Sequence, residues 1–418
     1  WPTHARQIEY RWGDVDGDAA DRLKELIAAA HARGIRVMFD IPLNHVHQDH
    51  EYRRDNPSWF TAAPCPCNND PSSTCGWDNP IGQLMCWFIE YLPDLDYRNH
   101  AIVERVAADV EWLVTEFDVD SFRIDAAKHM HHVIMRRIAM RLDERFVDGG
   151  GAPFYLVGET FTGETGHGLI MDYVNDTELD GQYDFPLLYP IRDAFARDGS
   201  FRNLAARRRI SEEQYGRFYP WMSPFLGNHD IPRFSAIVFG EPGAWEGRPD
   251  PMDAGLNDST WNLVNRMSQG FLYVLTQPGI PLIYYGDEIG LYGGADPDNR
   301  RMMKWSGLSD AQSTLLDRVA ALGAARQRHV ALRRGDYREL WVDDTFYVYA
   351  RVTPSGDVAI VAMNKGGGGS RNVPIPSDLG IDGVRFVDTL GGVRTVRPSA
   401  GNATFTLNSW EYAILVPE

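Results

Sequence analysis

The chain has 418 residues, of which 44% are hydrophobic and 24% charged, a composition typical of a globular protein with large cores in two or three domains. Its net charge of −17 argues against nucleic acid as a partner, because phosphates would be repelled. No run of about 18 apolar residues is present, so we expect no membrane span.

Helices and strands are predicted to alternate along the first three quarters of the chain. Apolar residues at helical spacing predict helices at 19–33, 101–117 and 261–275. Short apolar runs predict strands at 35–41, 119–124, 154–158, 182–188, 225–227 and 280–285. This alternation predicts a parallel α/β domain, to which we assign residues 1–47 and 93–325.

The alternation stops at two places. Residues 48–92 contain several prolines, Asn and Asp residues and all four cysteines, and they are too many for a featureless loop, so we expect a small inserted domain. In residues 326–418, strand-like segments at 345–352, 358–363, 404–407 and 412–416 are separated by turn residues. They predict an antiparallel β-sandwich domain.

The four cysteines fall within 22 residues, at Cys65, Cys67, Cys75 and Cys86. No CxxC pair is present, and no zinc pattern fits well. Two disulfides in an exported protein are the preferred interpretation, with zinc binding and free thiols as alternatives. Cys65 and Cys67 are too close in sequence to pair without strain, so we expect each to pair with Cys75 or Cys86. A secreted or periplasmic location follows, although no signal peptide is visible.

Four motifs place polar side chains at the ends of predicted strands. They are Asp40–His45 (DIPLNH), Phe122–His129 (FRIDAAKH), Val157–Thr160 (VGET) and Phe225–Asp230 (FLGNHD). The carboxyl ends of parallel strands meet at one rim of a βα-barrel, where active sites are built. Carboxylates arriving from different strands suit the cleavage of a glycosidic bond.

The order, residue types and spacing of these motifs resemble the α-amylase family of glycoside hydrolases, over nearly the whole chain. The resemblance implies a (β/α)8 TIM-type barrel, a small domain inserted after the third strand, and a C-terminal antiparallel β-sandwich. It also aligns Trp1 just after the second barrel strand, so we expect the first two strands to be missing from this sequence.

The resemblance implies three catalytic acids: Asp125 as nucleophile, Glu159 as acid/base and Asp230 as a third acid that grips sugar hydroxyls. Arg123 lies two positions before Asp125, on the same strand face, and a guanidinium there keeps the nucleophile ionised. Glu159 follows a buried apolar run, and burial favours the protonated acid. The implied reaction is double displacement with retention, which needs carboxyl groups about 5–5.5 Å apart.

The remaining site residues are also implied by the resemblance. His45 and His229 would hydrogen-bond to sugar hydroxyls, and Lys128 and His129 would contact the sugar on the leaving-group side. Arg123 belongs to the same substrate-binding group, and Asp40 would orient Arg123.

Calcium is the expected metal, with a structural role that ties the inserted domain to the barrel. The resemblance assigns as ligands Asn44, Asp94 of the segment 92–96 (LPDLD) and the main-chain carbonyl of His129. Oxygen ligands of mixed type suit calcium. A further ligand is expected from the inserted domain, with Asn68, Asn69, Asp70 and Asp78 as candidates.

The pair Lys128-His129 favours an enzyme that cuts inside α-1,4-glucans such as starch, glycogen and maltooligosaccharides, and we expect a monomer. Two alternatives remain. One is an α-glucan transglycosylase, in which a sugar instead of water captures the same intermediate. The other is a non-catalytic glucan-binding protein on the same fold, against which the intact Asp125, Glu159 and Asp230 speak.

Overall fold

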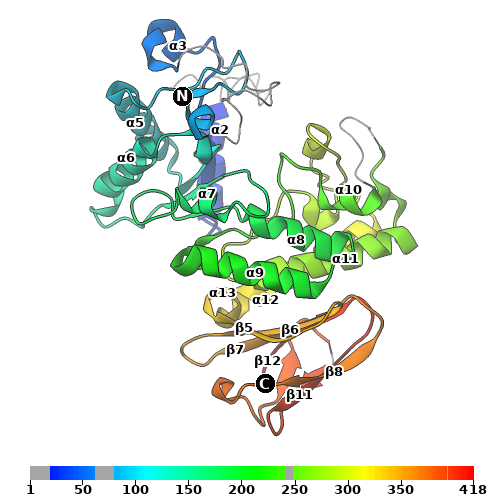
Figure 1. The fold of residues 1–418 in the computed structure, drawn as a ribbon. Coiled ribbons are helices and arrows are strands. Elements are labelled where there is room, and N and C mark those ends of the chain that lie inside the picture. The colour runs from blue at the N-terminus through cyan, green and yellow to red at the C-terminus, as the bar shows by residue number, and fades with distance from the viewer. Residues whose placement is uncertain (1–18, 62–79, 241–247, 393) are drawn as a thin grey trace. The chain divides into compact units, whose positions relative to one another are not determined.

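A computed structural model describes residues 19–61, 80–240, 248–392 and 394–418, with elements labelled as in Figure 1. The chain forms two compact units. The first runs to Thr162 and includes Gly166–Tyr183; the second comprises Gly163–Thr165 and Asp184–Glu418.

The first unit contains a parallel sheet with helices between its strands. Its strands are β1 (Met38–Ile41), β2 (Ser121–Ile124), β3 (Tyr155–Gly158) and β4 (Gly181–Gln182), in the order β1-β2-β3-β4. Its helices are α2 (Ala19–His31), α3 (Glu51–Asp55), α4 (Pro80–Met85), α5 (His100–Phe117), α6 (His132–Leu142) and α7 (His167–Met171), with short helical turns η1 (Pro57–Trp59), η2 (Ala127–His129) and η3 (Asp143–Val147).

The strand register sets the positions of the polar side chains. Asp40 on β1 pairs with Arg123 on β2, and Arg123 pairs with Val157 on β3. All three strands run in the same direction, so their carboxyl ends lie at one edge of the sheet. The long helix α5 buries Ile102, Val106, Val110, Leu113 and Phe117, as its apolar spacing predicts.

The helices of the second unit pack around one large core. They are α8 (Phe185–Ala196), α9 (Phe201–Tyr215), α10 (Phe234–Phe239), α11 (Asp258–Thr276), α12 (Asp310–Arg328) and α13 (Val330–Arg334), with the short turns η4 (Gly216–Trp221), η5 (Pro251–Ala254), η6 (Asp287–Ile289) and η7 (Asp298–Arg300). Between them, Phe225 and Leu282 form an isolated parallel bridge, where two strands were predicted.

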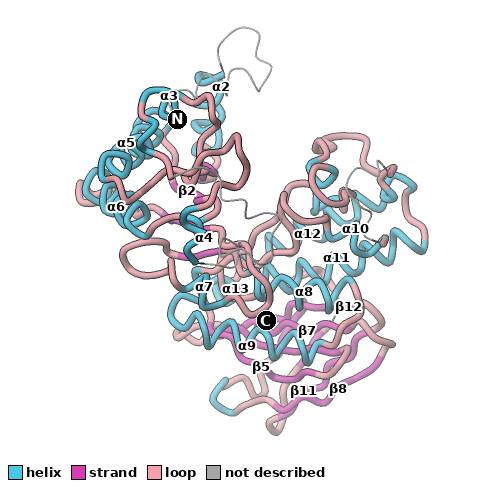
Figure 2. Tube along the Cα trace, turned by 45° about the horizontal axis from the view of Figure 1, so that its top comes forward, coloured by secondary structure: helices cyan, strands magenta, loops and turns pink. Residues whose placement is uncertain are grey.

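Antiparallel strands follow these helices. They are β5 (Asp336–Val342), β6 (Phe346–Val352), β7 (Val358–Asn364), β8 (Gly369–Pro374), β9 (Phe386–Asp388), β10 (Thr395–Val396), β11 (Asn402–Leu407) and β12 (Glu411–Pro417), with the turn η8 (Ser377–Leu379). Six of them form one sheet in the order β10-β9-β12-β7-β6-β5, and β11 pairs with β8 in a second sheet. Figure 2 shows these strands gathered beside α8 and α9.

The six-stranded sheet is buried on both faces. Tyr347 and Tyr349 of β6 join the helical core, whereas the alternate residues Phe346 and Val348 join a second core with Phe405 of the two-stranded sheet. Period-two alternation produces this division, since successive side chains of a strand point to opposite faces. The predicted antiparallel β-sandwich is therefore confirmed, whereas the predicted domain boundaries stay predictions.

One predicted strand was wrong. Residues 182–188 form only the short β4 and then the start of α8. The side chain of Asp184 accepts a hydrogen bond from the Leu187 amide and caps the helix, and Pro186 occupies its first turn. A short apolar run that is buried on all sides does not distinguish a strand from a buried helix by its spacing.

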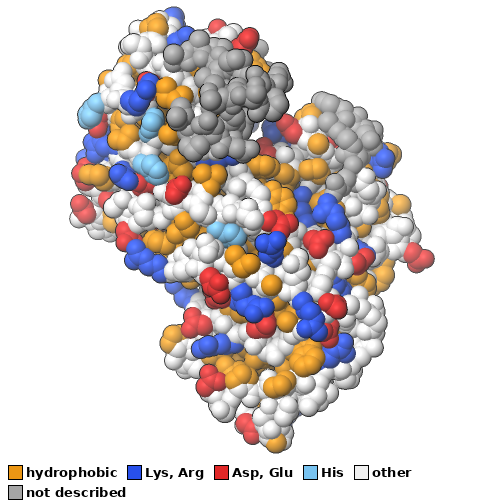
Figure 3. Space-filling model, in the orientation of Figure 1, with side chains coloured by type: hydrophobic (Ala, Val, Ile, Leu, Met, Phe, Trp, Pro, Cys, Tyr) orange, Lys and Arg blue, Asp and Glu red, His pale blue; other side chains and the backbone are white. Residues whose placement is uncertain are grey.

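None of the helices in the described residues combines the length and apolar character that a membrane crossing requires. On the face drawn in Figure 3, basic and acidic side chains are intermingled. Cys86 is buried; Cys65, Cys67 and Cys75 lie outside the described residues, so the disulfides stay a prediction.

Candidate active site

The carboxyl ends of β2 and β3 hold two of the three predicted acids. The Asp125 amide donates to the carbonyl of Ile41 (3.2 Å), and the Glu159 amide donates to the carbonyl of Ile124 (2.9 Å). These bonds continue the strand pairing by one residue past each strand. The sheet itself therefore fixes the backbone of Asp125 and Glu159 at its edge.

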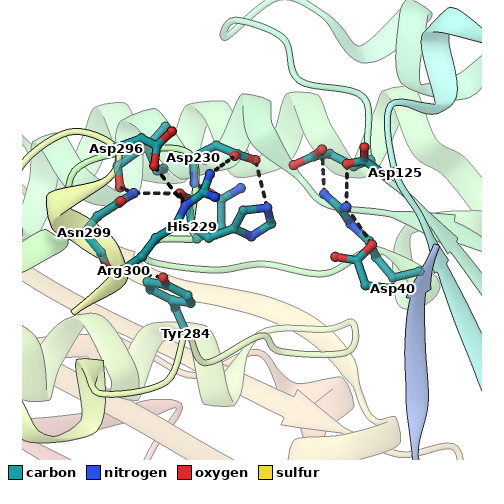
Figure 4. A network of polar contacts seen from close by, with 12 residues as sticks. Asp40, Asp125, His229, Asp230, Tyr284, Asp296, Asn299 and Arg300 are labelled. Atoms are coloured by element: carbon teal, nitrogen blue, oxygen red, sulfur yellow. Dashed lines mark hydrogen bonds and ion pairs between the residues drawn. The ribbon is translucent and has the colours of Figure 1, made fainter. Parts of the chain in front are cut away.

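Arg123 binds three carboxylates at this edge. Its Nη1 lies 2.7 Å from Oδ1 of Asp40 and 2.5 Å from Oδ1 of Asp125, and its Nη2 lies 2.6 Å from Oε2 of Glu159. Figure 4 shows the contacts to Asp40 and Asp125 as dashed lines. Because Asp125 and Glu159 bind the two terminal nitrogens of one guanidinium, their carboxyl groups are close neighbours.

Burial differs sharply among these partners. The side chains of Arg123 and Glu159 are 5% and 7% exposed, whereas those of Asp125 and Asp40 are 26% and 53% exposed. Burial alone would lower the pKa of Arg123, but the charges of Glu159, Asp125 and Asp40 outweigh it and raise that pKa. The Tyr183 ring lies 5.7 Å from the guanidinium and covers it.

Two backbone features crowd this edge. An added Cβ at Gly158 would lie 2.5 Å from Cδ1 of Leu179, so only glycine fits beside Glu159 without displacement. Ala126, directly after Asp125, has φ 51°, a left-handed conformation that is uncommon for residues other than glycine. Such strain persists only where the surroundings enforce it, and it often marks functional sites.

His45, Lys128 and His129 lie in the same unit. The Lys128 Nζ donates to the carbonyl of Phe161 (2.9 Å), and His129 Nδ1 lies 3.0 Å from the carbonyl of Gln83. Burial, reinforced by the charge of Lys128, lowers the pKa of His129 to about 4, so this imidazole is neutral. Burial also lowers the pKa of His45, against the opposing charge of Asp125.

The second unit presents His229 and Asp230 on the loop after Phe225. The Asp230 amide donates to Oδ1 of Asn228 (3.0 Å), a turn that fixes the acid at the loop tip. Nη2 of Arg300 lies 3.4 Å from Oδ1 of Asp230, and Arg300 also binds Asp296 (3.0 Å). Figure 4 shows this chain of contacts.

A buried ion pair holds that loop from behind. Arg233 and Asp287 are 0% and 1% exposed and lie 2.8 Å apart. Arg233 also donates to the carbonyl of Asn299, whose side-chain amide donates to the carbonyl of His229 (2.7 Å). The backbone of His229 is therefore held by groups that are protected from water.

The predicted calcium ligands Asn44 and Asp94 contact each other. Nδ2 of Asn44 donates to Oδ1 of Asp94 (3.0 Å), while the buried Oδ2 of Asp94 has no hydrogen-bond partner among the described residues. Asp94 is 1% exposed, and burial raises its pKa to about 8, because a buried carboxylate without a counter-charge is costly. A divalent cation would supply the missing partner, so these residues fit calcium.

The third predicted calcium ligand is the main-chain carbonyl of His129. Tyr173 donates to the carbonyls of Lys128 (3.3 Å) and Met130 (3.0 Å), which flank that of His129. Among the described residues no group of three or more His, Cys, Asp or Glu could hold a metal. The candidates Asn68, Asn69, Asp70 and Asp78 lie outside the described residues.

Three residues near these acids were not predicted. Tyr183 covers Arg123, Arg300 contacts Asp230, and the Phe88 ring lies 5.2 Å from His45 and 4.7 Å from His129. No spacing rule links Arg300 to Asp230, because 70 residues separate them.

Sequence comparison identifies relatives along nearly the whole chain. The protein-family model described as "Alpha amylase, catalytic domain" matches residues 3–328. A beta/alpha-amylase of Paenibacillus polymyxa is 30% identical over 95% of this chain and 30% of its own length. A cyclomaltodextrinase of Geobacillus thermopakistaniensis is 26% identical over 98% of this chain and 66% of its own length. The chain thus spans less than two thirds of these relatives.

Solved structures agree in fold. An α-amylase from Geobacillus thermoleovorans, complexed with acarbose, has a TM-score of 0.78 and 25% identity and covers 95% of this chain and 80% of that one. The cyclomaltodextrin glucanotransferase CldA has a TM-score of 0.77 and 23% identity and covers 96% and 79%. The predicted fold class, a (β/α) barrel with a C-terminal antiparallel β domain, is confirmed. Since the catalytic-domain match includes well over half of its residues, the chain belongs to the α-amylase family of glycoside hydrolases.

Proposed function

We propose that this chain hydrolyses α-1,4-glucosidic bonds inside starch, glycogen and maltooligosaccharides, with retention at the anomeric carbon. The observation that carries the proposal is the pair of carboxylates, Asp125 and Glu159, on the two terminal nitrogens of Arg123. Retention needs two neighbouring carboxyl groups, one to attack and one to transfer the proton.

Asp125 is the proposed nucleophile. Its carboxylate lies 2.5 Å from Nη1 of Arg123, and its side chain is 26% exposed and so accessible to a sugar. The carboxylate attacks the anomeric carbon while the glycosidic oxygen takes a proton and leaves. Water then attacks the glycosyl-enzyme, and the anomeric configuration is restored.

Glu159 is the proposed acid/base, and its contact with Arg123 has a consequence. A guanidinium stabilises the ionised carboxylate, but the first step needs a protonated one. Glu159 must therefore release Nη2 of Arg123 when substrate binds. Asp40 and Asp125 remain on Nη1, so the guanidinium keeps two of its carboxylates during this exchange.

The remaining assignments follow the family motifs. Asp230, held by the Asn228 turn and by Arg300, is the proposed third acid that binds sugar hydroxyls. His45 and His229 are proposed hydroxyl partners, and Lys128 and His129 are proposed contacts on the leaving-group side. A neutral His129 suits hydrogen bonding to a hydroxyl.

Calcium, held by Asn44, Asp94 and the carbonyl of His129, would fix the backbone next to Lys128. Its charge would compensate the buried carboxylate of Asp94. The role proposed for the ion is structural.

Transfer to a sugar instead of water is the second candidate. The relatives include cyclomaltodextrin glucanotransferases, such as one from Bacillus licheniformis that is 24% identical over 93% of this chain. The cyclomaltodextrinase relative adds cyclodextrins as a candidate substrate. The glycosyl-enzyme on Asp125 is common to all three reactions, so the acceptor and the substrate distinguish them.

The test is incubation of the purified chain, with calcium, on soluble starch and on α-cyclodextrin. Reducing ends, product sizes and the anomer released first are measured, the last by NMR. Asp125→Asn and Glu159→Gln are the test variants. Asp118→Asn is the matched control, because its side chain is 91% exposed and its left-handed backbone (φ 57°) accommodates asparagine.

We expect new reducing ends from starch in the α-configuration, lost in both test variants and kept in the control. Cyclic or redistributed glucans in place of reducing ends would instead identify a transglycosylase. An inactive but folded, calcium-loaded chain, or activity that survives Asp125→Asn, would contradict the proposal.

A further inference from the structure

A cavity of roughly 390 Å³ in the second unit is lined by arginines. It lies beside η4 and the α13–β5 connection, and two carboxylates line it against five guanidinium groups. The five are Arg217, Arg333, Arg334, Arg338 and Arg351. The cavity lining is therefore positively charged, whereas the chain as a whole carries a net charge of −17.

The buried Arg351 and the partly buried Arg326 contribute positive charge that no carboxylate offsets among the described residues. Arg351 is 1% exposed and donates to the carbonyls of Gly335 and Leu332. Arg326 also donates to carbonyls, including those of Leu332 and Gly279. Burial, together with repulsion from a neighbouring arginine, lowers the pKa of Arg326 and of Arg351 to about 10. Carbonyl dipoles hold these charges in place without neutralising them.

The wall of the cavity holds a buried hydroxyl whose hydrogen has no protein acceptor. Tyr219 lines the cavity and is 4% exposed, and its hydroxyl oxygen accepts a hydrogen bond from Arg208. Among the described residues its hydroxyl donates to no acceptor. Arg208 is 3% exposed, stacks 3.7 Å from the centroid of the Tyr337 ring, and also donates through Nη2 to Glu212 (2.8 Å). Buried donors are nearly always satisfied, so the Tyr219 hydroxyl calls for an acceptor.

The guanidinium of Arg208 influences the Tyr219 hydroxyl at the cavity wall. The charge of Arg208 lowers the pKa of the Tyr219 hydroxyl, although burial raises it overall to about 12. The hydroxyl therefore keeps its proton and is available as a donor. A ligand at this point would have to accept several hydrogen bonds and carry negative charge.

We propose that this arginine-lined cavity is a binding site for a multivalent oxyanion, either inorganic phosphate or the phosphate group of a sugar phosphate. The forked donors of arginine match the oxygens of a phosphate, and the Tyr219 hydroxyl adds a neutral donor. Water would satisfy the donors but leave the charge uncompensated. Chloride would offset the charge but offers a single atom as acceptor.

The test is equilibrium dialysis of the full chain with radiolabelled inorganic phosphate, without added calcium and at constant ionic strength. The double variant Arg334→Gln/Arg338→Gln removes two exposed arginines of the cavity, and Arg208→Gln removes the buried one. Arg385→Gln is the matched control, because Arg385 is an exposed arginine whose partner, Glu418, lies outside this cavity. Circular dichroism of each variant checks that it is folded.

We expect one saturable phosphate site per chain, weakened at least tenfold in the double variant and unchanged in the control. Competition by glucose 6-phosphate separates the two sources. If glucose 6-phosphate displaces the labelled phosphate at a lower concentration than unlabelled phosphate does, the ligand is a sugar phosphate. If it needs the same or a higher concentration, the ligand is free phosphate. No saturable binding by the folded chain, equal competition by chloride, or equal binding by the double variant would overturn the proposal.

Discussion

Arg123→Met would remove the charge that Asp40, Asp125 and Glu159 share. Loss of one partner of a buried ion pair costs roughly 3–5 kcal/mol, because the other charge stays buried alone. This figure applies to the ion pair with Glu159, whose side chain is 7% exposed. The ion pair with Asp40, whose side chain is 53% exposed, contributes only about 0–1 kcal/mol to stability. We therefore expect Arg123→Met to lower the free energy of unfolding by roughly 3–5 kcal/mol. A misplaced Asp125 should also reduce kcat by about 100-fold or more.

The assay is urea unfolding at pH 7, followed by circular dichroism, beside starch hydrolysis by the same samples. Arg123→Lys keeps a positive charge, but its single ammonium lacks the fork that reaches Asp125 and Glu159 together, so it should fall between wild type and Arg123→Met. Asp40→Asn, which removes only the exposed partner, is the control. A stability of Arg123→Met within about 1 kcal/mol of wild type would refute the reasoning, because Glu159 would then tolerate burial without the guanidinium.

Three further predictions concern stability. Burial raises the pKa of Asp184 from 3.8 to about 7, so between these values the unfolded chain has lost a proton that the folded chain keeps, and stability should fall by roughly 4 kcal/mol as pH rises. Asp184→Asn should reduce the difference in the free energy of unfolding between pH 4.5 and pH 7.5, measured by urea unfolding. An unchanged difference would show that another group causes the pH dependence. Removal of calcium with a chelator should lower Tm in the wild type but not in Asp94→Asn, and an equal loss in both would place the ion at another site. Gly158→Ala would bring a Cβ within 2.5 Å of Leu179, which should lower the free energy of unfolding by about 1–3 kcal/mol and also reduce hydrolytic activity. Thermal unfolding and starch hydrolysis measure the two effects, and wild-type values would show that Leu179 moves aside.

The sequence was informative where strand periodicity and order along the chain decide a contact. Alternation placed Arg123 and Asp125 on one face of β2, and the structure brings them to 2.5 Å. The predicted orientation of Arg123 by Asp40 corresponds to a parallel register pair and a 2.7 Å contact. The first inference needed only the pleat of the strand, whereas the second was implied by the resemblance to the α-amylase family.

The contact between Glu159 and Arg123 could not be predicted in the same way. It depends on the register of β3 against β2, which pairs Arg123 with Val157 and so brings Glu159, two residues later, to the same face. The burial of Glu159 that the apolar run predicted is present, but the guanidinium beside it favours the ionised form. Similarly, the helix α8 was mistaken for a strand because burial on all sides removes the polar face that gives a helix its period.

The arginines of this chain show how partners, rather than residue type, set the local potential. Arg123 is buried among carboxylates, so its charge is compensated, and the role proposed for it is to hold Asp125 and Glu159 in place for a neutral sugar. Arg351, which is buried, and Arg326, which is partly buried, donate to carbonyls, which orient a guanidinium but carry no net charge. Their positive potential is the basis of the proposed anion site. A neutral glucan gains nothing from that potential, whereas an oxyanion does. The proposed hydrolysis and the proposed oxyanion binding therefore depend on different arginines. We expect substitutions at Arg123 to affect hydrolysis alone and substitutions at Arg338 to affect phosphate binding alone.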